Sequence, residues 1–290
     1  MKVIHLPVML REVIMLLKPE SGGIYVDATV GLGGHSEEIL KHIGSGMLIG
    51  IDRDEEALDM AMSRLADNRV VLKKGRFSEI NRLVAETGVA EIDGILFDIG
   101  TSMFHLKTAG RGFSFLSEEP LDMRMDRAQD LTAADIVNRY SEKNIARILW
   151  EYGEERLSRK IAKAIVDYRV KKKINTCAEL SDIVCSVYKG RGKLHPATKT
   201  FQALRIVVND ELNELKKGLD AASGILKRGG RLCVISYHSL EDRIVKNFMR
   251  DNQKLGILTV MTKKPMVPSY EEVRLNPSAR SAKLRGAEKR

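Results

Sequence analysis

The 290-residue sequence is poor in aromatic residues and contains no long apolar run. Aromatic side chains make up 5% of the chain and charged ones 30%, a balance that fits a soluble α/β protein better than an all-β one. No apolar stretch reaches the roughly 18 residues that a membrane span needs. Residues 1–19 resemble a signal peptide only superficially, because Arg11 and Glu12 interrupt the apolar stretch and no small-residue cleavage site follows. We therefore expect a cytoplasmic protein without a membrane partner.

Cysteine is also scarce. Cys177, Cys185 and Cys233 form no CxxC pair and have no histidine nearby at metal-ligand spacing. An odd count without such a framework disfavours disulfides and zinc. We expect no metal site and interpret the cysteines as small buried hydrophobic residues in a reducing compartment.

Basic residues outnumber acidic ones, giving a formal net charge of +9. This excess favours a polyanionic partner, although many cytoplasmic enzymes are mildly basic without binding one. The charge gathers late in the chain, in "RVKKK" (169–173), "YKGRGKLH" (188–195) and "KLRGAEKR" (283–290). One such segment is ordinarily a solvated face, but three together indicate phosphate contacts.

The first hundred residues alternate between strand-like and helix-like segments. The expected strands are residues 23–30, 46–52, 69–75 and 92–100, and the expected helices are residues 36–44 and 54–66. Because the strands are almost continuously apolar, this alternation predicts a parallel sheet covered on both faces.

The pattern becomes helical and charged after about Phe104. It returns to α/β with a helix at 200–226, a strand at 229–238, a helix at 239–250 and a last strand at 255–261. The simplest organisation is one discontinuous α/β domain, residues 1–103 and 200–290, interrupted by a helical insertion at 104–199. We expect only the basic tail after about Asn276 to be flexible.

The segment "VDATVGLGGHS" joins the first strand to a helix through three glycines, Gly31, Gly33 and Gly34. Such a turn lets a ligand approach the backbone beside a helix N-terminus. Ser36 stands where the dinucleotide fingerprint has its third glycine, which weakens a nicotinamide interpretation without excluding it. Asp27 could accept a hydrogen bond from an ammonium group, which S-adenosylmethionine has and a dinucleotide lacks.

Two later strand ends carry acids. Asp52 closes the second strand about twenty residues past the glycines, where an acid accepts the ribose hydroxyls of an adenosine ligand. Phe77 could pack on adenine or be an ordinary core residue. Asp98 ends the fourth strand, where a carboxylate could accept hydrogens from an exocyclic amine and help it lose a proton. The alternative is that Asp98 only caps the following turn.

These motifs together resemble one family, the ribosomal small-subunit (16S) RNA cytosine-N4 methyltransferases, known as RsmH or MraW. The resemblance runs from His5 to Lys246, with a weaker echo in "ARSAKLR". The motifs, taken together in their order along the chain, are specific for this family. The most specific stretches are "RGFSF", "PLDMRMD" and "ISYHSLEDRIVK". It implies methyl transfer from S-adenosyl-L-methionine to N4 of a cytidine near the decoding centre, on a Rossmann-like core with an inserted helical, substrate-recognition domain.

The resemblance also implies particular contacts. It assigns cofactor binding to Gly34, His35, Ser36, Asp52, Phe77 and Asp98. His105 stands where the family commonly has Gln, and a neutral imidazole can replace one amide hydrogen bond but not both. The expected partner is 16S rRNA within the small ribosomal subunit, and a homodimer stays open.

Other motif residues have no cofactor role that we can derive. Three of them follow the fourth expected strand, residues 92–100: Arg111, Asp122 and Arg124. They would shape the cytidine pocket or order the loop over it. The alternative is that they form ion pairs that only fold the loop. His238 ends the strand at 229–238 and should face the same sheet edge. A lone histidine there is more often structural than a substrate contact.

Three other functions are weaker. A DNA amino-methyltransferase would carry a Pro-Pro-aromatic motif where residues 98–101 read Asp-Ile-Gly-Thr. A nicotinamide oxidoreductase is disfavoured by Ser36. A non-enzymatic RNA-binding factor would gain nothing from the acids Asp27, Asp52 and Asp98, because none of them helps to hold a phosphate backbone.

Overall fold

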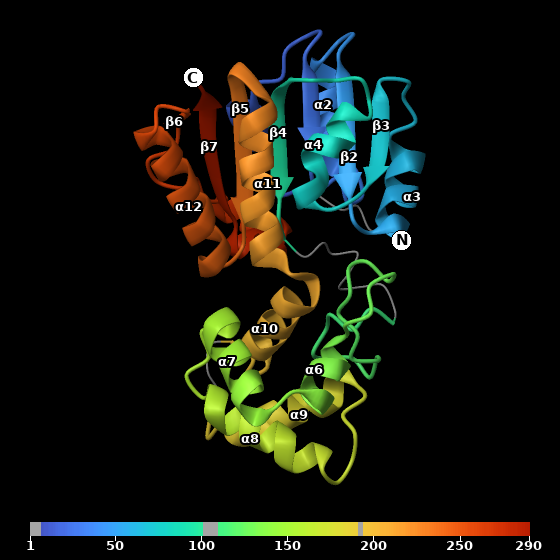
Figure 1. Ribbon diagram of the computed structural model, residues 1–290, viewed down its shortest axis with the longest axis vertical. Coiled ribbons are helices and arrows are strands. Elements are labelled where there is room, and N and C mark those ends of the chain that lie inside the picture. The colour runs from blue at the N-terminus through green and yellow to red at the C-terminus, as the bar shows by residue number, and fades with distance from the viewer. Residues whose placement is uncertain (1–6, 101–109, 191–193) are drawn as a thin grey trace. The chain divides into compact units, whose positions relative to one another are not determined.

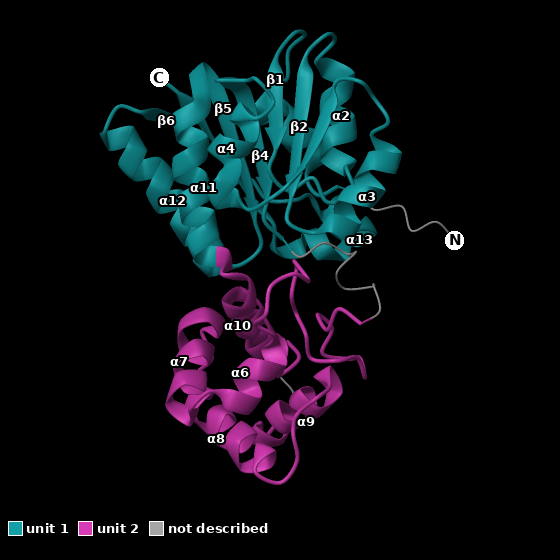
Figure 2. Cartoon of the chain, turned by 45° about the vertical axis from the view of Figure 1, so that its right-hand side comes forward, with its two compact units in different colours: residues 1–102, 212–290 teal, residues 103–211 magenta. Residues whose placement is uncertain are grey.

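The computed structural model describes residues 7–100, 110–190 and 194–290 (Figure 1). The chain forms two compact units, unit 1 with residues 1–102 and 212–290 and unit 2 with residues 103–211 (Figure 2). The predicted insertion, 104–199, falls inside unit 2. That unit runs on to Glu211 because helix α10 (Thr198–Asn209) packs on α7 (Glu142–Gly153).

Unit 1 is built on a seven-stranded sheet in the order β3-β2-β1-β4-β5-β7-β6. Strands β1 to β5 are parallel, whereas β7 is antiparallel to both β5 and β6. The sheet is therefore mixed rather than wholly parallel, and its first five strands have the Rossmann-like, doubly wound order. The strands are β1 (Ile24–Asp27), β2 (Met47–Asp52), β3 (Val70–Lys74), β4 (Ile92–Asp98), β5 (Leu226–Ser236), β6 (Leu258–Val260) and β7 (Lys283–Lys289).

Helices cover both faces of this sheet and bury a separate apolar core on each (Figure 1). One core takes side chains from α1, α2 and α3, and the other from α4, α11 and α12. The helices of unit 1 are α1 (Leu10–Leu17), α2 (Gly34–His42), α3 (Glu55–Arg64), α4 (Ile80–Ala85), α11 (Glu211–Ile225), α12 (Ser239–Lys254) and α13 (Tyr270–Leu275), with short 3₁₀ turns η1 (Phe77–Glu79) and η2 (Pro277–Ser281).

The expectation of a flexible tail after Asn276 is wrong. Strand β7 lies between β5 and β6 and pairs with both. Arg285 is buried, and its Nε donates to Asp242 Oδ1 of α12 at 2.7 Å. Lys289 donates to the carbonyl of Ser223. Basic residues of 283–289 thus form hydrogen bonds and ion pairs within unit 1, so this segment is not a mobile phosphate-binding arm.

Unit 2 is helical and has its own core. Its described helices are α6 (Ala133–Arg139), α7, α8 (Ser158–Arg169), α9 (Cys177–Val187) and α10. The single helix predicted for 200–226 is two helices, because Asp210 takes a left-handed conformation with φ of 49° and ends α10. In the described parts of both units, no helix is long and apolar enough to cross a membrane.

Candidate functional site

Acidic residues end three neighbouring parallel strands of unit 1. Asp27 is the last residue of β1, Asp52 of β2 and Asp98 of β4. The carboxyl ends of parallel strands meet at one edge, and the strand order reverses between β1 and β4, which is where ligands bind in such sheets. The structure therefore brings the three predicted acids to the expected binding edge.

The glycine loop is tied to the second of these acids. Gly31 and Gly33 have φ of 49° and 78°, a region that side-chain-bearing residues rarely adopt. The Gly31 N–H donates to Asp52 Oδ2 at 2.9 Å, while Asp52 Oδ1 accepts from the Asp54 N–H at 3.0 Å. Helix α2 then begins at Gly34 without a side-chain cap, so no capping side chain takes its first N–H groups, and a helix start of this kind can bind an anionic group.

Asp27 supports this loop from inside the fold. Its side chain is buried, with 1% exposed, and its Oδ2 accepts from the Ser36 hydroxyl at 2.7 Å. Oδ1 accepts from the Thr29 N–H at 3.2 Å. Burial raises the pKa of the Asp27 carboxyl, and the hydrogen bonds offset part of that rise. Asp27 thus fixes the loop and helix start, and its contact with an ammonium group stays a prediction.

Asp98 has two ring neighbours and still reaches solvent. The Tyr237 hydroxyl donates to Asp98 Oδ1 at 2.8 Å. His35 Nδ1 lies 3.7 Å from Asp98 Oδ2, and His35 Nε2 lies 2.9 Å from the Val8 carbonyl. The Asp98 side chain keeps 18% of its surface exposed. One oxygen is therefore held by the protein while the group stays open to a ligand.

Tyr237 is a further candidate site residue, and it was not among those predicted from the sequence. It follows β5, and its N–H donates to the buried Glu241 at 2.8 Å. A Cβ on Gly100 would lie 2.4 Å from the Tyr237 ring, so the glycine is what lets the ring pack there. Burial, reinforced by the Asp98 carboxylate, raises the pKa of Tyr237 well above its ordinary value. The hydroxyl therefore remains a donor at neutral pH. Its only signal in the sequence is its place inside "ISYHSLEDR".

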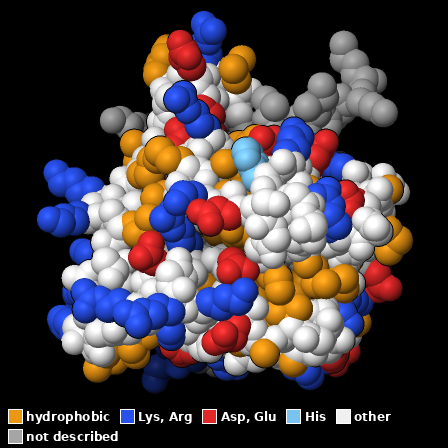
Figure 3. All heavy atoms as spheres, turned by 90° about the horizontal axis from the view of Figure 1, so that it is seen from above, with side chains coloured by type: hydrophobic (Ala, Val, Ile, Leu, Met, Phe, Trp, Pro, Cys, Tyr) orange, Lys and Arg blue, Asp and Glu red, His pale blue; other side chains and the backbone are white. Residues whose placement is uncertain are grey.

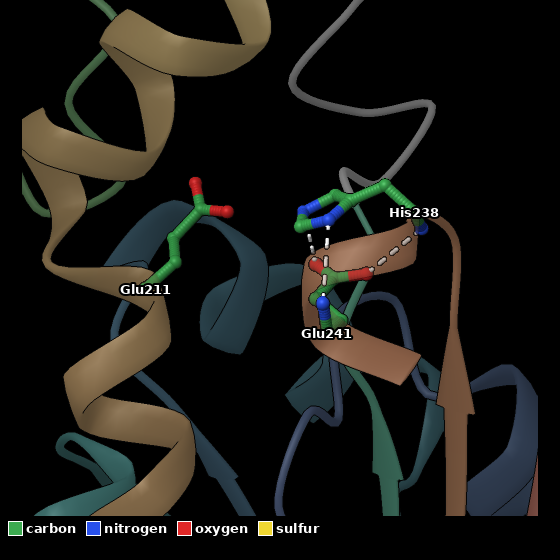
Figure 4. Close-up of side chains that lie close together, drawn as sticks. All are labelled: Glu211, His238 and Glu241. Carbon is green, nitrogen blue, oxygen red and sulfur yellow. Dashed lines mark hydrogen bonds and ion pairs between the residues drawn. The ribbon is translucent and has the colours of Figure 1, made fainter. Parts of the chain in front are cut away.

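His238 caps a helix. It is the N-cap of α12, where its Nδ1 accepts from the Glu241 N–H and its own N–H donates to the Glu241 carboxylate. Figure 4 shows the imidazole lying over Glu241. Glu211, also drawn there, belongs to unit 2 and accepts two hydrogen bonds from Arg205. These contacts favour a structural role for His238, and its substrate contact stays a prediction.

Phe77 is held by contacts on its own side of the sheet. Its ring packs edge to face on Phe97 with 5.3 Å between centroids, and the Arg53 guanidinium lies 5.6 Å from the ring centre. A Cβ on Gly218 would meet Phe77 at 2.5 Å. The ring is thus fixed in place but only half-buried, and packing on adenine stays a prediction.

The predicted substrate residues of unit 2 hold their own loop together. Arg124 forms a two-pronged ion pair with Asp122, at 2.8 and 2.9 Å, and also donates to the carbonyls of Arg127 and Gln129. Arg111 is buried and donates to the Met125 carbonyl at 2.9 Å. These contacts favour the loop-folding alternative. His105 lies outside the described residues.

A polar cavity of about 440 Å³ opens at the opposite edge of the sheet, beside the amino ends of β1 and β4. Two of its charged residues pair with one another, since Lys227 Nζ lies 3.0 Å from Asp93 Oδ2. Figure 3 shows the molecule from above the view of Figure 1, and basic, acidic and apolar side chains are interspersed over this face.

Comparison with known proteins assigns the chain to a family. Residues 2–290 match the MraW methylase family. The chain is 51% identical over 290 residues to the ribosomal RNA small subunit methyltransferase H of Persephonella marina, covering 98% of this chain and 99% of that protein. It is 52% identical to the protein of the same name from Dictyoglomus thermophilum, covering 99% and 97%.

A solved structure is similar at a lower level. The putative rRNA-methylase from Clostridium thermocellum has a TM-score of 0.47 and 14% sequence identity, covering 97% of this chain and 95% of that one. The predicted Rossmann-like methyltransferase core is confirmed by the sheet order together with the family. Methyltransferases of this family use S-adenosyl-L-methionine. The chain belongs to the MraW methylase family.

Proposed function

We propose that this protein methylates N4 of a cytidine in 16S rRNA, near the decoding centre of the small subunit. Relatives that are about half identical in sequence to this chain are named ribosomal RNA small subunit methyltransferase H. Their name supports small-subunit ribosomal RNA as the substrate. The choice of an exocyclic amine is supported by one observation above the others. A carboxylate, Asp98, stands at the binding edge with one oxygen held by Tyr237.

The residues at this edge suit S-adenosyl-L-methionine, which supplies an electrophilic methyl group. The positive-φ turn at Gly31 and Gly33 lets the backbone come close to the cofactor. The start of α2, which no side chain caps, offers N–H groups to the carboxylate of the cofactor. Asp52 stands where ribose hydroxyls are accepted in such folds. Phe77 offers a half-buried ring for adenine.

Asp98 then acts on the nucleobase. The lone pair of a cytosine amine is delocalised into the ring, so the amine must turn before N4 can accept a methyl group. Asp98 accepts one amine hydrogen, favours that turn and takes the proton that N4 loses. Tyr237 occupies Oδ1, which leaves Oδ2, on the His35 side, for the amine.

Nucleoside mass spectrometry tests the proposal. Purified protein and S-adenosylmethionine with a deuterated methyl group are incubated with free 16S rRNA or with assembled small subunits that lack the modification. We expect label in N4-methylcytidine at one position, and the two arms identify the substrate form. Label at C5 or N3 of cytosine, or no label with either substrate, would contradict the proposal.

A further inference from the structure

Unit 2 exposes the only tryptophan in the chain. Trp150 lies on α7 with 60% of its surface exposed. The same helix buries Ile145, Ile148 and Leu149 in the core of unit 2. A large ring on the outward face is therefore not needed for folding this helix.

Two exposed cations precede Trp150 along that outward face, and the exposed acids Glu151 and Glu154 follow it. Lys143 and Arg147 precede it by seven and three residues, a spacing that places all three along one side of a helix. Both are exposed. Among the described residues of α7 and α8, Trp150 is the one large apolar side chain that is exposed, which is unlike the extended apolar patch of a protein-docking site.

Helix α8 packs against α7 and is strongly basic (Figure 1). Residues 156–173, which span it and its flanks, contain eight Lys and Arg and one acid, Asp167, for a net charge of +7. Arg156, Arg159 and Lys160 are exposed and make no ion pair with any described residue. Two other cations of this segment are paired, Lys163 with Asp167 and Lys172 with Glu179. The basic segment 169–173 continues the same stretch.

We propose that the outward faces of α7 and α8 bind single-stranded RNA, with one base stacked on Trp150 and phosphates on the cations of 156–173. The inference rests on the proposed RNA substrate and adds where unit 2 holds it. Sequence-tolerant single-strand binding combines these two features, a basic track for the backbone and an aromatic ring for a base. Duplex RNA would use the cations but offers no unstacked base to the ring.

The single tryptophan allows the test to be made on the wild-type chain. A fluorescein-labelled 16S rRNA fragment reports binding by anisotropy, while an unlabelled copy is titrated to follow tryptophan emission and its quenching by acrylamide. Bound RNA should change the emission and shield the ring from acrylamide. Trp150→Ala should weaken binding about 5- to 150-fold, the range for the loss of one stacked base, and Trp150→Phe should restore part of it.

Charge reversal and a matched control complete the experiment. Arg159→Glu with Lys160→Glu should lower the slope of log affinity against log salt by roughly 0.7 for each phosphate that the variant no longer neutralises. Arg250→Glu, which changes an exposed cation on α12, should leave that slope unchanged. RNA binding with unaltered tryptophan emission, unaltered acrylamide quenching and full affinity in Trp150→Ala would overturn this inference and leave the proposed function standing. Absence of binding to the free fragment by the folded wild-type chain would also overturn this inference. It would leave the proposed function standing, because methylation of the assembled small subunit tests that function separately.

Discussion

Tyr237 donates its phenolic hydrogen to Asp98 across the ends of two neighbouring strands, β5 and β4, with 2.8 Å between the oxygens. The tyrosine is itself anchored, because its N–H donates to the buried Glu241 carboxylate and its ring packs beside Gly100. The helix start at "SYHSLE" thus holds the carboxylate at the binding edge in one orientation.

The Tyr237→Phe variant should show how much the hydrogen bond from Tyr237 to Asp98 contributes to turnover. Removing the hydroxyl leaves the ring packing but takes a donor from the ionised carboxylate, a kind of bond worth about 1.5–3 kcal/mol. Single-turnover methylation should slow by roughly 10- to 150-fold. Affinity for S-adenosylmethionine, measured by calorimetry, should change little. A loss of affinity with normal turnover would show that the tyrosine acts on the cofactor instead.

Asp52→Ala should weaken binding of S-adenosylmethionine. The substitution removes charge-assisted bonds to the ribose, worth roughly 1.5–3 kcal/mol, and also frees the Gly31 N–H that Asp52 now holds. Calorimetry measures the change, with Asp59→Ala on the exposed face of α3 as the matched control. Equal affinity in the two variants would mean that another residue binds the ribose. Tight binding of NAD by the wild-type chain would contradict the cofactor assignment itself.

Asp242→Asn should destabilise unit 1 in a pH-dependent way. Burial would raise the pKa of Asp242, but hydrogen bonds from Arg285 and Lys283 outweigh it and hold that pKa below its ordinary value. A carboxyl with a depressed folded-state pKa contributes stability above its unfolded pKa, near 4, and loses it as the pH falls through the folded-state value. We expect a loss of about 1.5–3 kcal/mol at pH 7.

Urea unfolding of wild type and variant at several pH values measures this difference. The difference in free energy of unfolding between wild type and variant should have its full size at pH 7 and shrink below about pH 4. A difference that is constant across this range, or absent at neutral pH, would mean that the β7–α12 ion pair does not stabilise the fold.

The binding edge was predictable because its signals are local. Asp27, Asp52 and Asp98 each follow a short apolar run, and parallel strands carry their ends to one edge. Tyr237 was not predictable in this way, because its partner lies 139 residues away in the chain. The roles of Arg111 and Arg124 also depend on which acceptors the folded loop brings near.

Two elements of the fold were not predictable from the sequence, for related reasons. Strand β7 has only a few apolar residues and carries Arg285 inside, where Asp242 of another element neutralises it. Nothing within 283–289 indicates that partner. The break between α10 and α11 depends on the left-handed backbone of Asp210, in a stretch whose helical periodicity otherwise continues.

The proposed role of Asp98 is to assist the amine of a cytidine, and the Asp98→Asn variant separates this role from cofactor binding. The variant keeps the size of the side chain and one acceptor oxygen but removes the charge. Cofactor affinity and single-turnover methylation of the small-subunit RNA are measured on the same preparation. We predict near-normal affinity with turnover reduced by roughly 10²–10⁴-fold, as for the loss of an acid–base group. Wild-type turnover, or a loss confined to cofactor affinity, would mean that Asp98 does not act on the amine.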